Sequence, residues 1–285
     1  MKFSSAILRG IAAFLAVSVI QVIAGTISPV LLPKTLPEDM ARHFLLWMLL
    51  ANAITVTALS VVALRSEWRG WKLGAVVAAI PVAITFINGI EGAIFLKNSH
   101  IDWPRIFLMT AIAAILSVPV WTLLFGRRKD VPPEHFHPIV SKSRGERAWK
   151  FLLCDASYLL LYLVAGTIIW PYIRDFYATQ TVPSMGTISA LQLLVRGPAF
   201  VALCLLLVRM LGMPRVSGAF AVGILFTLMS GLAPLLIPNP YFPDSVRWMH
   251  LCEVTSSNFI FAVLVGWLWG KSSDAIHAPA IAQAA

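Results

Sequence analysis

Charge is what this sequence most conspicuously lacks. Only 12% of its 285 residues are Asp, Glu, Lys or Arg, whereas soluble domains carry about 25%. Hydrophobic residues make up 59% of the chain, and the mean hydropathy is +0.81. A soluble fold cannot bury that excess, but lipid tails solvate it. The composition therefore excludes a water-soluble domain of any size and predicts an integral membrane protein.

Cysteine and the common nucleotide and hydrolase motifs are also scarce. The three cysteines, Cys154, Cys204 and Cys252, all fall in apolar runs, where we expect small buried side chains and no disulfide. The sequence contains no GxxxxGK[ST], HExxH, GxSxG or CxxCH. These absences argue against a nucleotide-driven machine and against a soluble-type hydrolase.

Long apolar runs are abundant, and each is long enough to cross a bilayer, which takes about 20 residues. The runs are continuous rather than alternating, which favours helices over barrel strands. In lipid a helix also satisfies every backbone hydrogen bond internally. The eight predicted spans are 5–32, 43–64, 71–96, 105–126, 149–173, 187–208, 216–237 and 248–270.

The basic residues are distributed unevenly between the two predicted membrane faces. With eight spans both termini lie on one side, and that side receives 15 of the 22 Lys and Arg residues. Six fall on the other side, and Arg196 lies inside a span. Basic loops stay cytoplasmic, so we predict a bacterial-type inner-membrane protein with both termini in the cytoplasm. This explains the net charge of +9 without a nucleic-acid partner.

The two halves of the chain resemble each other. Residues 24–27 and 165–168 both read AGTI, and LLANAI at 49–54 aligns with LLVRGP at 193–198. Further matched pairs are 58–65 with 202–209, 74–78 with 218–222, Asp102 with Asp244, and Arg105 with Arg247. Because four spans is an even number, both halves would insert in the same sense. We therefore predict an all-α membrane fold built as two parallel four-helix repeats.

The repeat divides the chain into four parts. Residues 1–126 form the first repeat and 149–270 the second. Between them, 127–148 is a basic cytoplasmic linker that contains His135 and His137, and we interpret it as a solvated loop rather than a metal site. The Ala-rich tail, 271–285, is predicted to be disordered.

Four ionisable residues, Glu91, Arg196, His250 and Glu253, fall within or at the edge of spans. Such residues are costly in lipid and by default suggest a functional site facing the bundle interior. Counting a rise of about 1.5 Å per residue from the cytoplasmic ends puts the two glutamates and Arg196 in the outer half, within about 9 Å of one level. We therefore predict that these four residues converge on one outer-leaflet cavity between the halves.

Two asparagines extend the predicted site. Asn88 precedes Glu91 by three residues, the same spacing that separates His250 from Glu253, and Asn258 adds a polar group on the last span. These residues break the repeat, because Arg196 aligns with Asn52 and the two glutamates align roughly with alanines. We therefore expect a single asymmetric site built on two halves that share a similar helical scaffold. Asp155, near the cytoplasmic end of its span, is expected to extend toward water.

These features favour a transporter or permease-like bundle for a small solute or ion, in contact with the lipid bilayer. A membrane-embedded enzyme is the first alternative, in which Glu91, His250 and Glu253 serve as acid and base or as metal ligands. A non-catalytic membrane partner or assembly protein is the second. The pattern predicts no particular cofactor and no oligomeric state.

Overall fold

The computed structural model describes residues 3–31, 38–96, 102–126, 143–238 and 242–270. The first half contains α1 (Phe3–Leu31), α2 (Glu38–Arg65), α3 (Gly70–Phe95) and α4 (Trp103–Phe125). The second half contains α5 (Arg144–Tyr177), α6 (Met185–Leu191), η3 (Gln192–Arg196), α7 (Gly197–Leu211), α8 (Arg215–Thr227), η4 (Leu228–Leu232), α9 (Ala233–Leu236) and α10 (Asp244–Trp269). All these elements are helical, which confirms the all-α fold class. The linker and tail predicted from the sequence lie almost wholly outside the described residues.

Eight helical stretches are long and apolar enough to cross a membrane, as predicted. Each contains most of one of the expected apolar runs. Two spans depart from a simple helix, because α6, η3 and α7 together form the sixth span, and α8, η4 and α9 form the seventh. In both, a five-residue π-helical segment widens the turn just before a proline, Pro198 or Pro234. Single π turns within α-helices are rare and frequently occur at functional sites.

Local sequence explains where several helices begin and end. Asp102 accepts a hydrogen bond from the backbone amide of Arg105 and so caps α4, where Pro104 follows at the first turn. Ser143 caps α5 and Ser184 caps α6 in the same way. Such caps satisfy amides that have no partner within the helix. At the end of α7, Gly212 adopts φ 56°, a left-handed conformation that glycine accepts without strain.

Large apolar side chains cover the outside of the bundle. Leu194 is 77% exposed, Ile115 70%, Leu8 67% and Ile168 66%. A soluble protein rarely exposes so much contiguous apolar surface, whereas a bilayer solvates it. The outer surface therefore fits contact with lipid.

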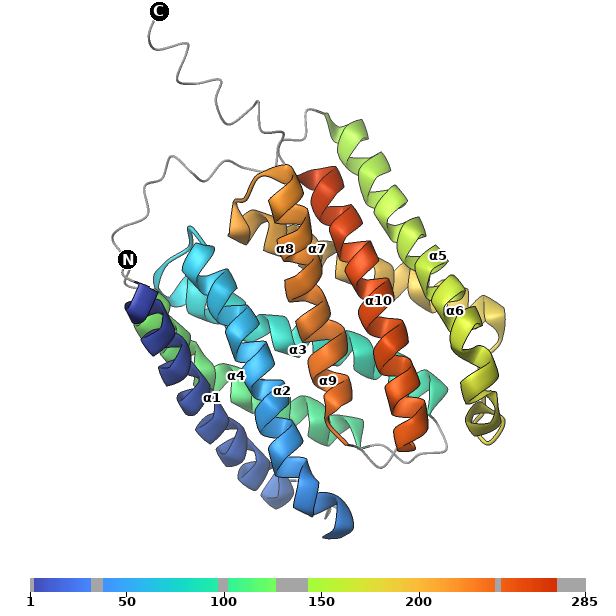
Figure 1. Cartoon of the computed structure of the whole chain (residues 1–285), viewed down its shortest axis with the longest axis horizontal. Helices are drawn as coiled ribbons and strands as arrows, with labels where there is room; N and C mark the ends of the chain where they lie inside the picture. The colour runs from blue at the N-terminus through green and yellow to red at the C-terminus, as the bar shows by residue number, and fades with distance from the viewer. Residues whose placement is uncertain (1–2, 32–37, 97–101, 127–142, 239–241, 271–285) are drawn as a thin grey trace, which may run out of the picture.

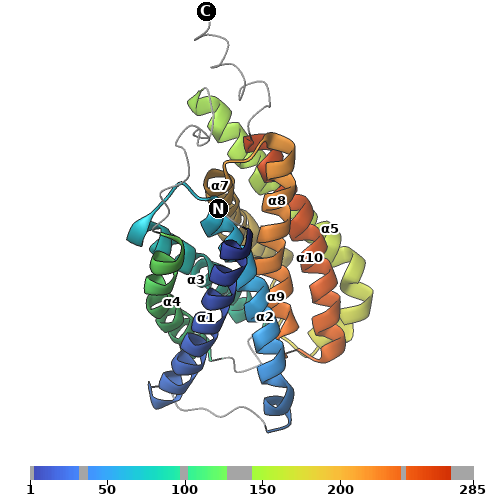
Figure 2. The ribbon, with the colours of Figure 1, turned by 60° about the vertical axis from the view of Figure 1, so that its left-hand side comes forward.

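The spans pack in a similar order within each half. In the first half α4 packs most extensively on α3 and next on α1, and in the second half α10 packs most extensively on α8 and next on α5. In the view of Figure 1, α1 and α5 lie at opposite edges of the bundle, and the turned view of Figure 2 brings α1 to the front. Between the halves, α2 contacts α7, η4 and α9, and α3 contacts η4. The α3 helix runs obliquely behind α8 and α10 (Figure 1), which brings its C-terminal part to the second half.

An aromatic cluster forms the core of the second half. Tyr158, Phe200, Phe226 and Phe261 come from four different spans, and all are at most 4% exposed. Their rings meet edge to face, with centroids 5.1–6.1 Å apart. Such pairs add stability beyond the area they bury. This cluster is the rigid base on which the polar residues described next are held.

Candidate functional site

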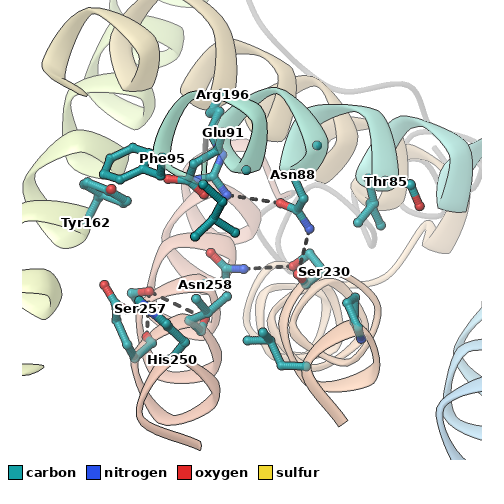
Figure 3. Close-up of a pocket in the computed structure, with 18 of the residues that line it drawn as sticks. Thr85, Asn88, Glu91, Phe95, Tyr162, Arg196, Ser230, His250, Ser257 and Asn258 are labelled. Carbon is teal, nitrogen blue, oxygen red and sulfur yellow. Dashed lines mark hydrogen bonds and ion pairs between the residues drawn. The ribbon is translucent and has the colours of Figure 1, made fainter. Parts of the chain in front are cut away.

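A cavity of about 360 Å³ lies among six of the eight spans, the third to the eighth. Figure 3 shows residues of α3 on one side of it, facing residues of α10 and η4 on the other. Its polar lining residues are Thr85, Asn88, Glu91, Tyr158, Tyr162, Tyr177, Arg196, Ser230, His250, Glu253, Ser257 and Asn258. The structure thus places all six residues proposed from the sequence in the wall of one cavity.

Arg196 lies at the centre of the first polar group. It is the last residue of η3 and is only 5% exposed. Its Nη1 lies 2.6 Å from Oε1 of Glu91, and its Nη2 donates to Oδ1 of Asn88 at 3.1 Å. The guanidinium carbon of Arg196 lies over the Phe200 ring, 5.2 Å from its centroid. The charge is therefore held between an anion, an amide and an aromatic face, which is a favourable setting for a buried guanidinium.

Gln192 completes this group. It is fully buried, and its Nε2 donates to Oε1 of Glu91 at 3.1 Å. Its Oε1 in turn accepts from Nη1 of Arg196 at 3.3 Å. The π-helical segment begins at Gln192 and ends at Arg196, so the widened turn carries both side chains that bind Glu91. Sequence reasoning missed Gln192, although its position four residues before the buried charge could have indicated a shared helix face.

Two glycines determine how α3 presents Asn88 and Glu91. A Cβ atom at Gly89 would meet the Phe107 ring at 2.6 Å, and one at Gly92 would overlap the ring of Trp103. The absence of side chains at these positions lets α4 pack closely against one face of α3. Asn88 and Glu91 line the cavity together with both glycines, so the close approach of α4 forms part of the same wall.

A second polar group runs from α5 to α10. The hydroxyl oxygen of Tyr177 lies 2.9 Å from Nε2 of His250, and Nδ1 of His250 lies 2.7 Å from Oε2 of Glu253. The carboxyl group of Glu253 is close to Gly166 of α5, where a Cβ atom would stand 3.6 Å from Oε1. Tyrosine, histidine and glutamate in one hydrogen-bonded chain can pass a proton along it. Sequence reasoning missed Tyr177, because nothing along the chain shows that the end of α5 meets the start of α10.

Ser230 of η4 joins the last span to the third. Asn258 donates from Nδ2 to the Ser230 hydroxyl at 2.9 Å, and Asn88 donates to the Ser230 carbonyl at 3.3 Å (Figure 3). Because Asn88 also accepts from Arg196, these bonds form one chain from α10 through η4 and α3 to η3. Ser230 was not singled out from the sequence, because serine is common in apolar helices.

Asp155 does not behave as expected. It was predicted to extend toward water, but it is only 7% exposed and its Oδ1 has no hydrogen-bond partner. Its carboxylate abuts Gly197, where any Cβ atom would overlap it. The reason is that α5 begins at Arg144, so Asp155 lies about three turns inside the helix rather than at its end. At that depth it is level with Gly197, the residue after Arg196. It is not among the residues that line the cavity.

A metal centre has no support in the geometry. Among the described residues, no group of three His, Cys, Asp or Glu side chains is placed to hold a metal ion. His250 and Glu253 bond to each other, while Glu91 is paired with Arg196. The linker histidines His135 and His137 lie outside the described residues.

Comparisons with known proteins find no match for the chain. No protein-family model matches it, and neither a curated protein nor a solved structure matches it. The cavity and the contacts in its wall are therefore what a function for this protein has to explain.

Proposed function

We propose that the protein is a polytopic inner-membrane transporter for a small solute, and that the cavity around Arg196 is its binding site. One observation carries the proposal. The ion pair between Arg196 and Glu91 joins the sixth span to the third, so it links the second half of the chain to the first at the wall of a solute-sized cavity. Transporters open and close by moving one such half against the other around a fixed site. The pair is a latch that must break for that movement.

The packing of the spans supports two parallel four-helix repeats as the frame of this transporter. Within each half the fourth span packs chiefly on the third and then on the first. The third and seventh spans also meet each other, at Asn88 and Ser230. Asn88 lies 14 residues beyond Gly74, and Ser230 lies 12 residues beyond the matching Gly218. Contact between nearly equivalent positions is what an axis relating the two halves would produce.

Protons are the coupling ion that the site favours. Glu91 is 23% exposed at its side chain, whereas Arg196 is 6% exposed, so the carboxylate is the more accessible member of the pair, and a carboxylate, unlike a guanidinium, can accept a proton. Protonation of Glu91 removes the charge that holds Arg196 and so weakens the latch. The chain from Tyr177 through His250 to Glu253 lies in the same wall and offers a second carboxylate for the proton.

The orientation follows from the 15 to 6 division of basic residues, with both termini cytoplasmic. In that orientation the loop at Gln180 faces outward and the loop at Met213 faces the cytoplasm. In a Cys252→Ser background, we expect a membrane-impermeant maleimide to label Gln180→Cys in intact cells and Met213→Cys only after permeabilisation. The reverse pattern would overturn the orientation.

An enzyme is the second candidate, and one observation favours it. Tyr177, His250 and Glu253 form a hydrogen-bonded chain of the kind that activates a general acid or base. The assembly-protein alternative is weaker, because the charge of Arg196 is already paired with Glu91 within the chain.

One experiment separates transport from catalysis whatever the identity of the solute. Proteoliposomes are incubated with a deproteinised cell extract under an inward proton gradient, and the vesicle contents are analysed by mass spectrometry. We expect an unaltered solute to accumulate in wild-type vesicles and not in vesicles with Arg196→Gln. Arg174→Gln is the matched control, because that side chain is 65% exposed and lies outside the cavity.

The outcomes are distinct. Accumulation that disappears when the proton gradient is collapsed supports a proton-coupled transporter. Appearance of a chemically altered compound, with no accumulation, would contradict the transporter proposal and support the enzyme alternative. Equal contents in wild-type and Arg196→Gln vesicles would show that the Arg196–Glu91 pair is not required for transport.

A further inference from the structure

A second cavity, of about 310 Å³, lies chiefly in the first half of the chain. The first four spans supply most of its wall, and η4 and α9 close it from the second half. Only Ile84, Thr85 and Pro234 line both cavities, so the two spaces adjoin but have separate walls. Small-molecule sites commonly enclose about 300–1,000 Å³, so this cavity can hold a small ligand.

Two carboxamides in this second cavity have an atom without a partner. Asn52 of α2 is only 4% exposed, and its Nδ2 donates to the Ser18 hydroxyl at 2.6 Å. The Oδ1 of Asn52 is buried and unpaired, and so is the Oε1 of Gln21 on α1. Buried polar atoms in proteins are nearly always hydrogen-bonded. An occupant of the cavity is the natural source of the missing bonds.

The wall contains no charge that could bind an ion. None of its described lining residues is Asp, Glu, Lys, Arg or His. Two of its hydroxyls are already used, because Thr110 and Ser117 donate to backbone carbonyls of their own helix. A charged ligand would therefore lose its hydration without a counter-charge. A hydroxyl both donates and accepts, so it can pair with either end of a carboxamide, whichever way the amide is turned.

We propose that the second cavity is a binding site for an uncharged amphiphile that carries a hydroxyl group. The hydroxyl donates to Oδ1 of Asn52 and accepts from the Gln21 carboxamide turned with its nitrogen toward the cavity, and the apolar body packs against Phe44, Met48 and Trp121. Gln21, Phe44 and Met48 are only partly buried. They belong to α1 and α2, whose ribbons diverge toward one end of the bundle (Figure 2). The ligand is expected to enter past these partly buried residues, and the proposal does not depend on transport through the first cavity.

The test uses a photoreactive probe and full-length protein in lipid nanodiscs. The probe is a twelve-carbon alcohol with a diazirine in its chain, compared with its methyl ether and with the corresponding carboxylate. Labelled residues are mapped by mass spectrometry. Asn52→Leu and Gln21→Leu remove one amide each, and Thr167→Val is the matched control, a polar residue exposed on the outside of α5.

We expect saturable labelling of the cavity residues of α1, α2 and α4 by the alcohol. The methyl ether and each amide variant lose one hydrogen bond, so the apparent affinity of labelling should be about 5-fold weaker than that of the alcohol with the wild type. Thr167→Val should label as the wild type does. Equal labelling by alcohol and ether, or by alcohol and carboxylate, would overturn the proposal. Unsaturable labelling spread over the lipid-exposed helix faces would also overturn it, and would leave water as the occupant.

Discussion

The two cavities of this protein are similar in place and size but opposite in chemistry. One encloses about 360 Å³ and the other about 310 Å³. The four spans of the second half bound the first cavity together with the third and fourth spans, and the four spans of the first half bound the second cavity together with the seventh span. The first contains two carboxylates, an arginine and a histidine, whereas the described wall of the second contains only neutral side chains. The volume of each cavity thus depends on how the spans pack, and the charged side chains of the first cavity are not needed to form that volume.

Individual positions show the same contrast. In the proposed repeat Arg196 corresponds to Asn52, and Tyr162 corresponds to Gln21. Both members of each pair line a cavity. A buried charge is retained only where something offsets its desolvation. Arg196 has Glu91, Asn88 and Gln192 around it, while Asn52 has only Ser18 and an unpaired oxygen.

The largest effect should come from removing one charge of the pair. Arg196→Asn leaves the partly buried Glu91 without its partner. Breaking a fully buried pair in this way costs about 3–5 kcal/mol. Because the Glu91 side chain is partly exposed, the free energy of unfolding, from denaturant titration in mixed micelles, should fall by no more than that amount. The double variant Arg196→Asn with Glu91→Ala removes both charges of the pair, so it should recover much of the loss while remaining inactive.

The control for this prediction is Arg174→Asn. Its side chain is exposed, so its effect should stay within about 0.5 kcal/mol. If the double variant were as unstable as Arg196→Asn alone, the unpaired carboxylate would not be the cause of the instability.

The converse change places a charge in the neutral cavity. Ala233→Glu introduces a carboxylate near the position that Glu91 occupies in the other half. A single charge at membrane depth costs about 2.5–3.5 kcal/mol on insertion scales. The same titration should show that loss for Ala233→Glu and a clearly smaller one for the uncharged Ala233→Gln. Equal losses would mean that volume, not charge, distinguishes the two cavities.

Glu253 should affect pH dependence more than stability. Glu253→Gln keeps a hydrogen-bond acceptor for His250 but can no longer take up a proton. Uptake into proteoliposomes should then vary much less with external pH than in the wild type. Asp102→Asn is the matched control, because asparagine caps a helix as well as aspartate does and Asp102 lies outside the cavity lining. An unchanged pH profile in Glu253→Gln would exclude this carboxylate as a proton acceptor.

The smallest effect is expected from Tyr177→Phe, which deletes the α5 hydroxyl that is hydrogen-bonded to His250 of α10. A neutral hydrogen bond contributes about 1 kcal/mol, so stability should fall by about that much. Tyr172→Phe on the same helix removes an exposed hydroxyl and should change stability hardly at all. Both are read from the same titration, and equal values for the two variants would mean that the Tyr177–His250 bond adds nothing.

The spans and the charged site could be read from the sequence for a simple reason. A run of about 20 apolar residues has few structural alternatives in lipid, so the second and seventh spans, Phe44–Arg65 and Arg215–Leu236, begin and end close to where hydropathy puts them. Glu91, Arg196 and Glu253 stood out because any charge within such a run needs a partner. What brought them together in one wall is the packing of six spans.

The remaining features depend on tertiary contacts that no local pattern records. Gln192 is polar but uncharged, and its importance comes from the π-helical turn that aligns it with Arg196. Tyr177 reaches His250 only because α5 is 34 residues long. Asp155 was misplaced for the same reason, since the depth of a residue in a long helix depends on how far that helix extends beyond its neighbours.

The short Arg196–Glu91 pair also has an electrical consequence. Its two charges are separated by 2.6 Å, so the intact pair forms a compact dipole on which a transmembrane voltage exerts little net force. In the proposed transport cycle, opening of the pair leaves Arg196 as a whole positive charge inside the field. Moving one such charge across the membrane is worth about 2.3 kcal/mol per 100 mV. The proposal therefore implies that the opened pair, unlike the closed one, is sensitive to membrane potential, and that a cell's resting voltage biases which way the positive charge moves.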